Sequence, residues 1–271
     1  MPITVLTHPP KGGVRTPVPP LVIAHRGASA GWPENTIPAF VAGIDQGADM
    51  IEVDVHLSAD GELVVVHDVT LDRTTNIRTL HPERTDTRVK SLTAAEIAEL
   101  DAGSWKDESF VGLQVPTLAE VLALVHTTRT GLLLEVKHPN LYPGIAEAIV
   151  RACDELPDYL DRSLAAGLLV VQSADWDFVR EFHELAPEVP VGLLGRPTLE
   201  QLREFAAWVD QINPEHIDAD AEYLTTVHEL GMSSLVWTVD AVTDMEKSIE
   251  YGADGIITNV PDVLVEVVEE L

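Results

Sequence analysis

The stretch MIEVDVHLSADGELVVVHD, residues 50–68, decides the fold that the sequence predicts. Its first half alternates aliphatic with polar residues, which is typical of a strand that carries Glu52 and Asp54 on one face. The Asp-Gly pair in its middle is a hairpin signal, so a second strand is expected to return and end at His67. Two carboxylates on one face repel each other unless a cation lies between them, and a divalent metal is the simplest such cation. The hairpin brings His67 back towards these two carboxylates, which suggests acid/base chemistry beside the metal.

Strands and helices alternate along most of the chain. Runs predicted as strands lie near residues 21, 50, 131, 166, 189, 208, 234 and 255. Strict alternation implies a parallel sheet, and eight repeats in this length favour an α/β fold, the (β/α)8 TIM barrel. A doubly wound open sheet is the alternative, but no Gly-x-Gly-x-x-Gly follows the first strand, which weakens a dinucleotide-binding version. The first helix is expected to follow Asn35, which is interpreted as its N-cap.

Two segments depart from this alternation. Residues 68–115 are polar and irregular, with one short helical candidate over Thr93–Leu100, and are interpreted as a small insertion after strand two. Residues 1–20 are rich in proline and lack the continuous apolar run of a signal peptide, so an N-terminal arm is expected there. Residues 21–271 are then the barrel domain.

The charge balance excludes several kinds of partner. Lys and Arg number 17 against 45 Asp and Glu, a net charge of -28, which argues against nucleic acid and anionic membrane surfaces. No apolar run reaches the length of a membrane span, so stable membrane insertion is not expected and a cytoplasmic location is the default prediction. The single cysteine, Cys153, allows no disulfide within the chain. A negatively charged substrate would need a local positive pocket.

Polar side chains follow several predicted strands at the point where each strand ends. In a barrel this is the face that carries function. The residues concerned are His25, Arg26, Glu135, Lys137, Gln172 and Trp237. Ending an apolar strand with Glu135 and Lys137 on one face is costly unless both are used. The simpler alternative, that these two pair only with each other at a rim, is strained when a second strand shows the same pattern.

The types of these residues indicate phosphate ester chemistry. Glu52, Asp54 and Glu135 form a set of oxygen ligands that suits Mg²⁺ or Ca²⁺ better than zinc or copper. Two cations, Arg26 and Lys137, are placed to hold a phosphate. Two histidines, His25 and His67, are the natural acid/base pair. One further histidine, His56, shares the face of Glu52 and Asp54 and is interpreted as a rim residue outside the site.

The chain resembles the glycerophosphodiester phosphodiesterase family in an ordered series of short motifs. They are AHRG (24–27), PENT (33–36), EVDV (52–55), DG (60–61), HD (67–68), LDRTT (71–75), PTL (116–118), EVK (135–137), WTV (237–239) and GADGIITNVPD (252–262). The resemblance extends from about residue 21 to the C-terminus. It implies a (β/α)8 barrel, and it identifies residues 68–115 as the subdomain that this family inserts after strand two.

The resemblance also implies the roles of the site residues. One divalent cation, Mg²⁺, Ca²⁺ or Mn²⁺, is held by Glu52, Asp54 and Glu135, His25 and His67 are the catalytic acid and base, and Arg26 and Lys137 bind the phosphate. In the family's mechanism one histidine activates the neighbouring glycerol hydroxyl, which attacks phosphorus and forms a cyclic phosphate. The other histidine protonates the leaving alcohol, and water then opens the ring to glycerol 3-phosphate. The sequence leaves open which histidine acts in which step. Gln172 and Trp237 are interpreted as substrate contacts.

Three functions remain open from the sequence. The first is hydrolysis of small glycerophosphodiesters, in glycerol and lipid metabolism. The second is a lysophospholipase D with the same site, which needs an apolar wall that the polar insertion hardly offers. The third is a non-catalytic barrel that binds phosphate esters, although a pure binder has no need for two histidines. Three departures from the family pattern are Ser58, where threonine is usual, Ala174, where phenylalanine is frequent, and Asp240, where asparagine is common. The change at Ala174 predicts a more open pocket wall.

Overall fold

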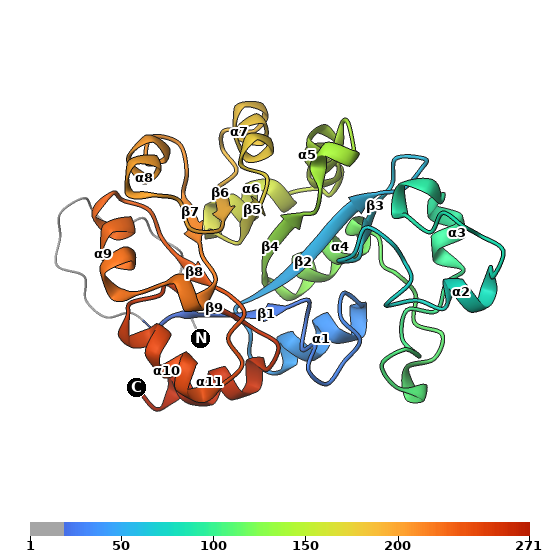
Figure 1. Ribbon diagram of the computed structural model, residues 1–271, viewed down its shortest axis with the longest axis horizontal. Coiled ribbons are helices and arrows are strands. Elements are labelled where there is room, and N and C mark those ends of the chain that lie inside the picture. Colours follow the sequence, from blue (N-terminus) through green and yellow to red (C-terminus); the bar gives the residue numbers. More distant parts are fainter. Residues whose placement is uncertain (1–18) are drawn as a thin grey trace.

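Eight parallel strands wind into a ring, and helices cover its outside (Figure 1). The computed structural model describes residues 19–271, so almost all of the arm predicted for residues 1–20 lies outside the described residues. Hydrogen-bonded neighbours follow the order β7-β6-β5-β4-β2-β1-β9-β8. Parallel bridges from Gln211 to Ser233 and from Glu215 to Trp237 join β7 to β8. The predicted barrel is therefore confirmed, and the open doubly wound sheet is wrong.

A strand is present near each predicted position. The barrel strands are β1 (Leu21–His25), β2 (Met50–Leu57), β4 (Gly131–Val136), β5 (Leu169–Ser173), β6 (Val191–Leu194), β7 (Gln211–Asn213), β8 (Leu235–Val236) and β9 (Gly255–Thr258). The helices that follow them are α1 (Ile37–Asp45), α4 (Leu118–Thr128), α5 (Ile145–Glu155), α7 (Trp176–Leu185), α8 (Leu199–Phe205), α9 (Ala221–Glu229), α10 (Val242–Glu250) and α11 (Pro261–Glu269). One helix that was not predicted, α6 (Tyr159–Ala166), precedes β5.

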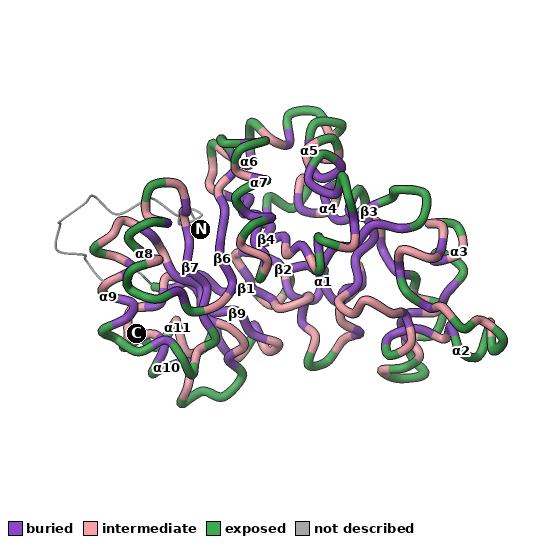
Figure 2. Tube along the Cα trace, turned by 45° about the horizontal axis from the view of Figure 1, so that its top comes forward, coloured by how far each residue is buried: buried purple, intermediate pink, exposed green. Residues whose placement is uncertain are grey.

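The two faces of each strand serve different cores. Side chains that point outward, such as Val53 and Leu134, pack with the helices in the main apolar core. Inside the barrel a smaller apolar layer forms a floor; it consists of Leu21, Ile23, Met50, Leu133, Val170, Leu235 and Ile257. Figure 2 shows the strands as the most deeply buried part of the chain. Because side chains alternate along a strand, the next inward position on each strand lies directly above this floor.

Glycine makes room for the large side chains of the floor. A Cβ added to Gly131 would lie 2.5 Å from Cγ of Met50, and one added to Gly255 would lie 2.6 Å from a methyl group of Leu235. Both distances are shorter than any real Cβ contact. Large floor side chains therefore pack directly against the strand backbone at these glycines, and the hollow lies above them, at the C-terminal ends of the strands.

The expected hairpin follows β2. Strand β3 (Leu63–Val65) runs antiparallel to β2, with Val55 opposite Val65. The chain then forms α2 (Ile77–Leu80), η1 (Val89–Ser91), α3 (Ala94–Ala98) and η2 (Glu108–Phe110) before it reaches α4. Figure 1 places α2 and α3 beside the barrel, outside its ring of helices.

A separate apolar cluster lies under this segment. Its members are Val64, Val66, Leu71, Ile77, Val89, Leu92, Ile97, Leu100, Ala102 and Val115. The predicted helix over Thr93–Leu100 is α3, and it begins with a capping box in which Thr93 and Glu96 exchange hydrogen bonds. We propose on this basis that residues 68–115 form an insertion subdomain. Within residues 19–271, no helix combines the length and apolar character needed to cross a bilayer.

Candidate active site

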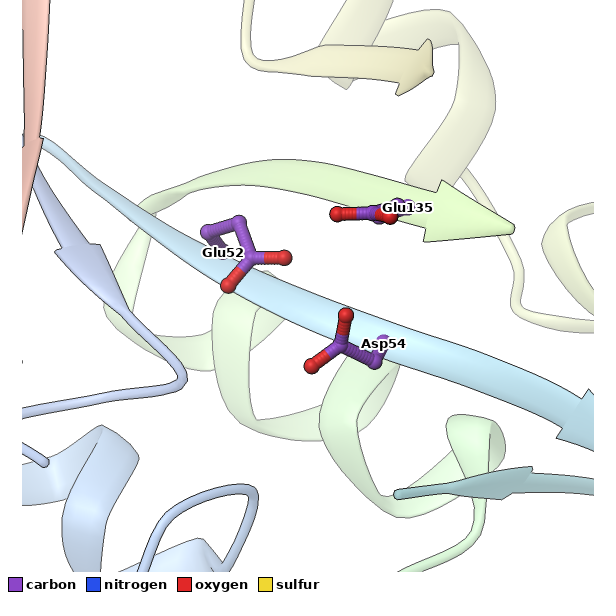
Figure 3. A group of neighbouring side chains, drawn as sticks. All are labelled: Glu52, Asp54 and Glu135. Carbon is purple, nitrogen blue, oxygen red and sulfur yellow. The ribbon is translucent and has the colours of Figure 1, made fainter. Parts of the chain in front are cut away.

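The residues predicted for the site converge at the C-terminal ends of the strands. A hollow of about 270 Å³ opens there. Eight of the nine predicted residues line it; they are His25, Arg26, Glu52, His67, Glu135, Lys137, Gln172 and Trp237. The ninth, Asp54, is fully buried beside Glu52 and Glu135 (Figure 3). The structure thus brings the predicted residues together, while their roles stay predictions.

Three carboxylates form a cluster at this hollow. Glu52, Asp54 and Glu135 each place one carboxylate oxygen within 4.8 Å of the other two. Burial, reinforced by the charge of Asp54, raises the pKa of Glu52 well above its ordinary value, and burial raises the pKa of Glu135 to about 7. Oε1 of Glu52 and Oδ1 of Asp54 are buried without a hydrogen-bond partner in residues 19–271. Because a hard divalent cation prefers several such oxygens, these three residues fit one.

Two cations lie against Asp54. Nε of Arg26 is 3.1 Å from Oδ2 of Asp54, and Nζ of Lys137 is 3.7 Å from Oδ1. Nζ of Lys137 also donates to Oε1 of Glu135 at 2.5 Å. Burial alone would raise the pKa of Asp54, but the charges of Arg26 and Lys137 outweigh it and lower that pKa. Asp54 therefore stays ionised at neutral pH.

Asn35 supports Asp54 and does not cap a helix. Thr36 is the N-cap of α1, since its side chain accepts a hydrogen bond from the backbone N–H of Ala39. The prediction that Asn35 caps this helix is wrong. Asn35 has a φ of 56°, in the left-handed region that asparagine tolerates, and its Nδ2 donates to Oδ2 of Asp54 at 2.8 Å. The turn before α1 thus serves the carboxylate cluster.

The side-chain amide of Asn259, itself held by the carboxylate of Asp240, orients His25 at the end of β1. Nδ1 of His25 lies 2.7 Å from Oδ1 of Asn259, whose Nδ2 donates to Oδ2 of Asp240 at 2.7 Å. The carboxylate of Asp240 accepts only, which orients the amide, so Nδ1 of His25 carries the proton. Burial, together with the charge of Arg26, lowers the pKa of His25 to about 4. The ring is neutral at pH 7, with Nε2 as its acceptor.

A carboxylate holds His67 at the end of the hairpin. Nδ1 of His67 lies 2.7 Å from Oδ1 of Asp68. An ionised carboxylate accepts only, so Nδ1 donates here as well, and Nε2 is the ring atom that remains for proton transfer. Asp68 in turn accepts from Nε of Arg73 at 2.7 Å and from its Nη2 at 3.0 Å. These bonds to Arg73, with the help of His67, hold the pKa of Asp68 far below its usual range.

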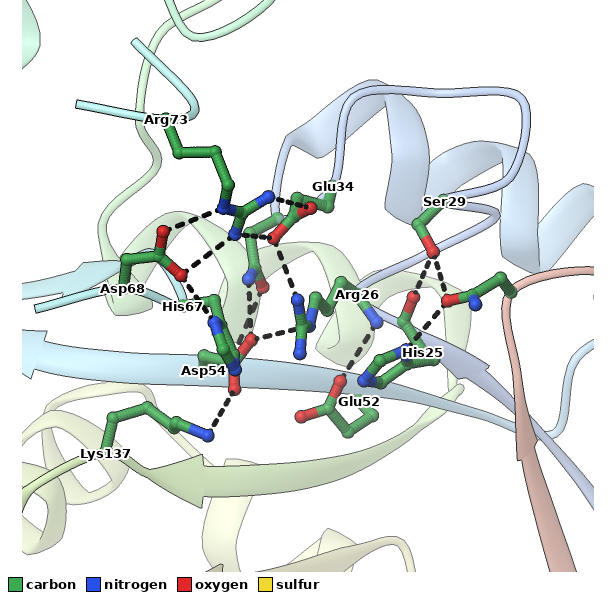
Figure 4. A network of polar contacts seen from close by, with 12 residues as sticks. His25, Arg26, Ser29, Glu34, Glu52, Asp54, His67, Asp68, Arg73 and Lys137 are labelled. Atoms are coloured by element: carbon green, nitrogen blue, oxygen red, sulfur yellow. Dashed lines mark hydrogen bonds and ion pairs between the residues drawn. The ribbon is translucent and has the colours of Figure 1, made fainter. Parts of the chain in front are cut away.

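Arg73 connects the pair of His67 and Asp68 to Glu34, in the loop that follows β1 (Figure 4). Its two terminal nitrogens donate to the carboxylate of Glu34, each at 2.8 Å. Glu34 also accepts from Nη1 of Arg26 at 2.9 Å, and Arg26 reaches Asp54. A continuous chain of charged groups therefore runs from Asp68, in the segment after the hairpin, to the carboxylates of the barrel. Sequence reasoning had not singled out Glu34 or Arg73, although both lie within the short motifs.

His56 supports His67 from below. It is 0 % exposed, so its interpretation as a rim residue is wrong. Nε2 of His56 lies 3.1 Å from the carbonyl oxygen of His67, and Nδ1 lies 2.8 Å from the hydroxyl of Tyr142. Because a carbonyl oxygen accepts only, Nε2 donates to it, and Nδ1 of the neutral ring accepts from the Tyr142 O–H. The position of His56 on the polar face of β2 was the signal that could have identified it as a supporting residue.

The opposite wall of the hollow contains Gln172 and Trp237. Both side chains are held by Asn213 at the end of β7. Nδ2 of Asn213 donates to Oε1 of Gln172 at 2.8 Å, and Nε1 of Trp237 donates to the carbonyl oxygen of Asn213 at 2.8 Å. These two residues therefore face the hollow in fixed orientations, and their contact with substrate stays a prediction.

The chain is similar to known proteins over nearly its whole length. Residues 25–263 match the glycerophosphoryl diester phosphodiesterase family. The glycerophosphodiester phosphodiesterase of Caldanaerobacter subterraneus is 37% identical over 253 residues, covering 92% of this chain and 98% of that protein. A glycerophosphodiester phosphodiesterase of Bacillus subtilis is 32% identical over 274 residues, covering 96% and 90% of the two chains.

Solved structures agree with these matches. A phosphodiesterase from Oleispira antarctica, solved in complex with the product sn-glycerol-3-phosphate, superposes with a TM-score of 0.80 at 27% identity, covering 92% of this chain and 97% of that chain. A glycerophosphodiester phosphodiesterase from Agrobacterium tumefaciens superposes with a TM-score of 0.72 at 26% identity, covering 91% and 99%.

Proposed function

The chain belongs to the glycerophosphoryl diester phosphodiesterase family and is a glycerophosphodiester phosphodiesterase, and we propose how its site performs this hydrolysis. The products are glycerol 3-phosphate and an alcohol, and His25 and His67 are the acid and base. The observation that carries this proposal is the arrangement of the two rings. Each has its Nδ1 engaged by an oxygen acceptor, and both line the hollow above the three carboxylates. Two oriented rings leave two Nε2 atoms for proton transfer.

A divalent cation completes the site. Glu52, Asp54 and Glu135 would hold it, with the two carboxylate oxygens that lack a hydrogen-bond partner within residues 19–271 as part of its ligand set. Such a cation, Mg²⁺, Ca²⁺ or Mn²⁺, supplies Lewis-acid polarisation of a phosphoryl oxygen and neutralises its charge.

Arg26 and Lys137 orient the phosphodiester. They bring positive charge to the hollow of a chain whose net charge is -28, and without them an anionic substrate would be repelled. Burial works against the charge of Lys137, but Glu135 and Asp54 outweigh it and raise its pKa, so the ammonium stays protonated. Gln172 and Trp237 form the wall against which the substrate lies.

The two histidines exchange protons with the substrate. In the first step, one Nε2 takes the proton of the glycerol hydroxyl next to the phosphoryl group as that oxygen bonds to phosphorus. The bond from phosphorus to the departing alcohol breaks, and the other histidine gives that oxygen a proton. In the second step, water attacks the cyclic phosphate with the two histidines in reversed roles, and the ring bond breaks to give glycerol 3-phosphate.

Turnover of a substrate panel tests this proposal. We expect the purified protein to release glycerol 3-phosphate from glycerophosphocholine, glycerophosphoethanolamine and glycerophosphoinositol. A chelator should abolish this activity, and Mg²⁺, Ca²⁺ or Mn²⁺ should restore it. Faster turnover of lysophosphatidylcholine would favour a lysophospholipase D, and tight binding of glycerophosphocholine without turnover would favour a non-catalytic barrel. Activity indifferent to chelation would contradict the metal site.

A further inference from the structure

A second hollow adjoins the candidate active site where β4 and β5 end. Its volume is about 570 Å³, roughly twice that of the first. It lies between the loops of residues 135–140 and 173–177. Glu135, Lys137 and Ala174 line both hollows, so the two share a border at these residues. The substrate has two parts joined by one phosphate, and the second hollow is open to whichever part extends beyond the first.

On the β5 side, the border between the hollows carries only a small side chain, that of Ala174. Ala174 is exposed, and its single methyl group stands where β5 leads into α7. The hydroxyl of the neighbouring Ser173 is held in place, since it donates to the carbonyl oxygen of Val136 at 2.7 Å. Glu135 and Lys137, on the other side, are tied to each other. A chain of atoms attached to a phosphate in the first hollow can therefore pass into the second.

The walls become more acidic along this path. In the first hollow, the cations Arg26 and Lys137 stand against the carboxylates Glu52 and Glu135. Farther out, Asp175 and Asp177 line the second hollow and also a third one of about 320 Å³, where Glu147 and Glu181 join them. Among the lining residues of this third hollow, all within residues 19–271, none is Lys or Arg. Carboxylates that line a cleft of low dielectric attract cations and repel anions.

A fixed aromatic ring stands in the same wall. Trp176 lines the second hollow, and its Nε1 donates to the carbonyl oxygen of Leu194 at 2.8 Å. Its ring lies edge-on to Phe205, with the centroids 5.6 Å apart. The indole is therefore held in one orientation beside the acidic loop. Tryptophan is the aromatic residue that best attracts an ammonium group, and quaternary ammonium ligands are recognised in this way.

We propose that the second hollow is a subsite for the leaving alcohol and that it selects alcohols that carry an ammonium group. The inference rests on the proposed function, in which the first hollow holds the glycerol phosphate part of the diester. Arg26 and Lys137 take the phosphate there, and the carboxylates of Asp175 and Asp177 beyond Ala174 take a cationic head group. A neutral head group, such as glycerol or inositol, gains neither charge attraction to Asp175 and Asp177 nor a cation–π contact with Trp176.

Two substitutions remove the negative charge without disturbing the helix. Asp175 is the N-cap of α7 and accepts from the backbone N–H of Phe178, and asparagine is an equally good cap. Asp177 is exposed in the first turn. Since exposed ion pairs contribute ~0.2–1 kcal/mol, each of Asp175→Asn and Asp177→Asn should raise KM for glycerophosphocholine by up to about 5-fold. Trp176→Leu should raise it by about 2- to 5-fold.

The experiment compares kcat/KM for glycerophosphocholine and glycerophosphoethanolamine with that for glycerophosphoglycerol. We expect the wild type to prefer the two cationic substrates by about 10-fold at 0.02 M NaCl and by less at 0.5 M, because salt screens the attraction. The double variant Asp175→Asn, Asp177→Asn should lose this preference through KM, with kcat and the neutral substrate unaffected.

A carboxylate on α9, away from the hollows, supplies the matched control. Glu222 is exposed in the first turn of α9 and lines none of the three hollows. The substitution Glu222→Gln should therefore change neither KM nor kcat. Equal kcat/KM for cationic and neutral substrates in the wild type at low salt would overturn the subsite and leave the proposed function intact. Equal losses on both substrates in the double variant would also overturn it. A protein that hydrolyses none of the three would overturn the proposed function itself.

Discussion

The two candidate catalytic histidines are supported by two different regions of the molecule. His25 ends a barrel strand, and its partner Asn259 follows the neighbouring strand β9, so the hydrogen-bond ladder of the barrel places both. His67 follows β3, outside the barrel, and its side chain is 29% exposed. Charged groups hold it, through Asp68 and Arg73. The barrel thus positions one ring through its backbone, whereas the other ring depends on ion pairs between side chains.

This difference has consequences for robustness. A ladder of backbone hydrogen bonds is independent of most side-chain changes, and it places His25 and Asn259 as soon as the barrel forms. Ion pairs near the surface contribute less each, are screened by salt, and are lost with a single substitution. Glu34 accepts from both Arg26 and Arg73, so it links the two regions. We therefore expect the His67 side to be the more sensitive to substitutions outside the catalytic residues.

Removal of either ring should have the largest effect. General acid–base catalysis contributes about 10²- to 10⁴-fold, so His25→Ala and His67→Ala should each lower kcat by that amount with the fold intact by circular dichroism. Because the two rings act in the same step, the double variant should lose little more than either single one. Additive losses would show that the two regions act in separate steps.

Removal of the group that orients each ring should lower kcat more on the His67 side than on the His25 side. Asp68→Asn removes a charged acceptor, and hydrogen bonds to charged groups are worth ~1.5–3 kcal/mol, so kcat should fall by about 10- to 100-fold. On the other side, Asn259→Ala removes a neutral acceptor and should lower kcat by about 2- to 10-fold. Initial rates at saturating substrate measure both. Equal losses would contradict the distinction between charged and neutral support.

Removal of Arg73, which links the two regions, should lower kcat less than removal of the groups that orient the rings. Arg73→Met breaks the connection from Asp68 to Glu34 and should lower kcat by about 3- to 10-fold. Its matched control is Arg88→Met in the same segment, where the lost partner is Asp86, 2.6 Å away and outside the chain of charges. Steady-state rates of the two variants should differ, and identical rates would remove Arg73 from the support of His67.

Removal of the Tyr142 hydroxyl, which supports His56, should have the smallest effect on kcat. Tyr142→Phe leaves Nδ1 of the buried His56 without its donor, which costs ~1 kcal/mol of unfolding free energy and should lower kcat by about 2- to 5-fold through the backbone of His67. Tyr223→Phe is the control, because this buried hydroxyl also donates a hydrogen bond, in its case to the carbonyl oxygen of Pro197 and away from the hollow. Urea unfolding should show similar destabilisation in both, with a loss of kcat only in Tyr142→Phe.

Local patterns in the sequence were sufficient for the architecture. Period-two alternation and helical stripes depend on which face of an element is buried, so they predicted all the barrel strands and the hairpin. They missed α6, whose N-cap residue Asp158 has a φ of 60° and makes no capping hydrogen bond through its side chain, so the usual start signal is absent. Strand ends likewise predicted the residues of the hollow, because parallel strands present their carboxyl ends on one face.

The sequence by itself therefore determined the barrel, the site's place on it and the residue types that meet there. Only the tertiary structure decided how those residues are held. Asn259 is 234 positions from His25, and Tyr142 is 86 positions from His56. Whether such residues meet depends on strand register, on the turn before α1 and on the path of the segment after the hairpin. Periodicity reports only whether a side chain faces the core, since burial is a property of one position, whereas a hydrogen bond requires two side chains to meet at a defined distance and angle.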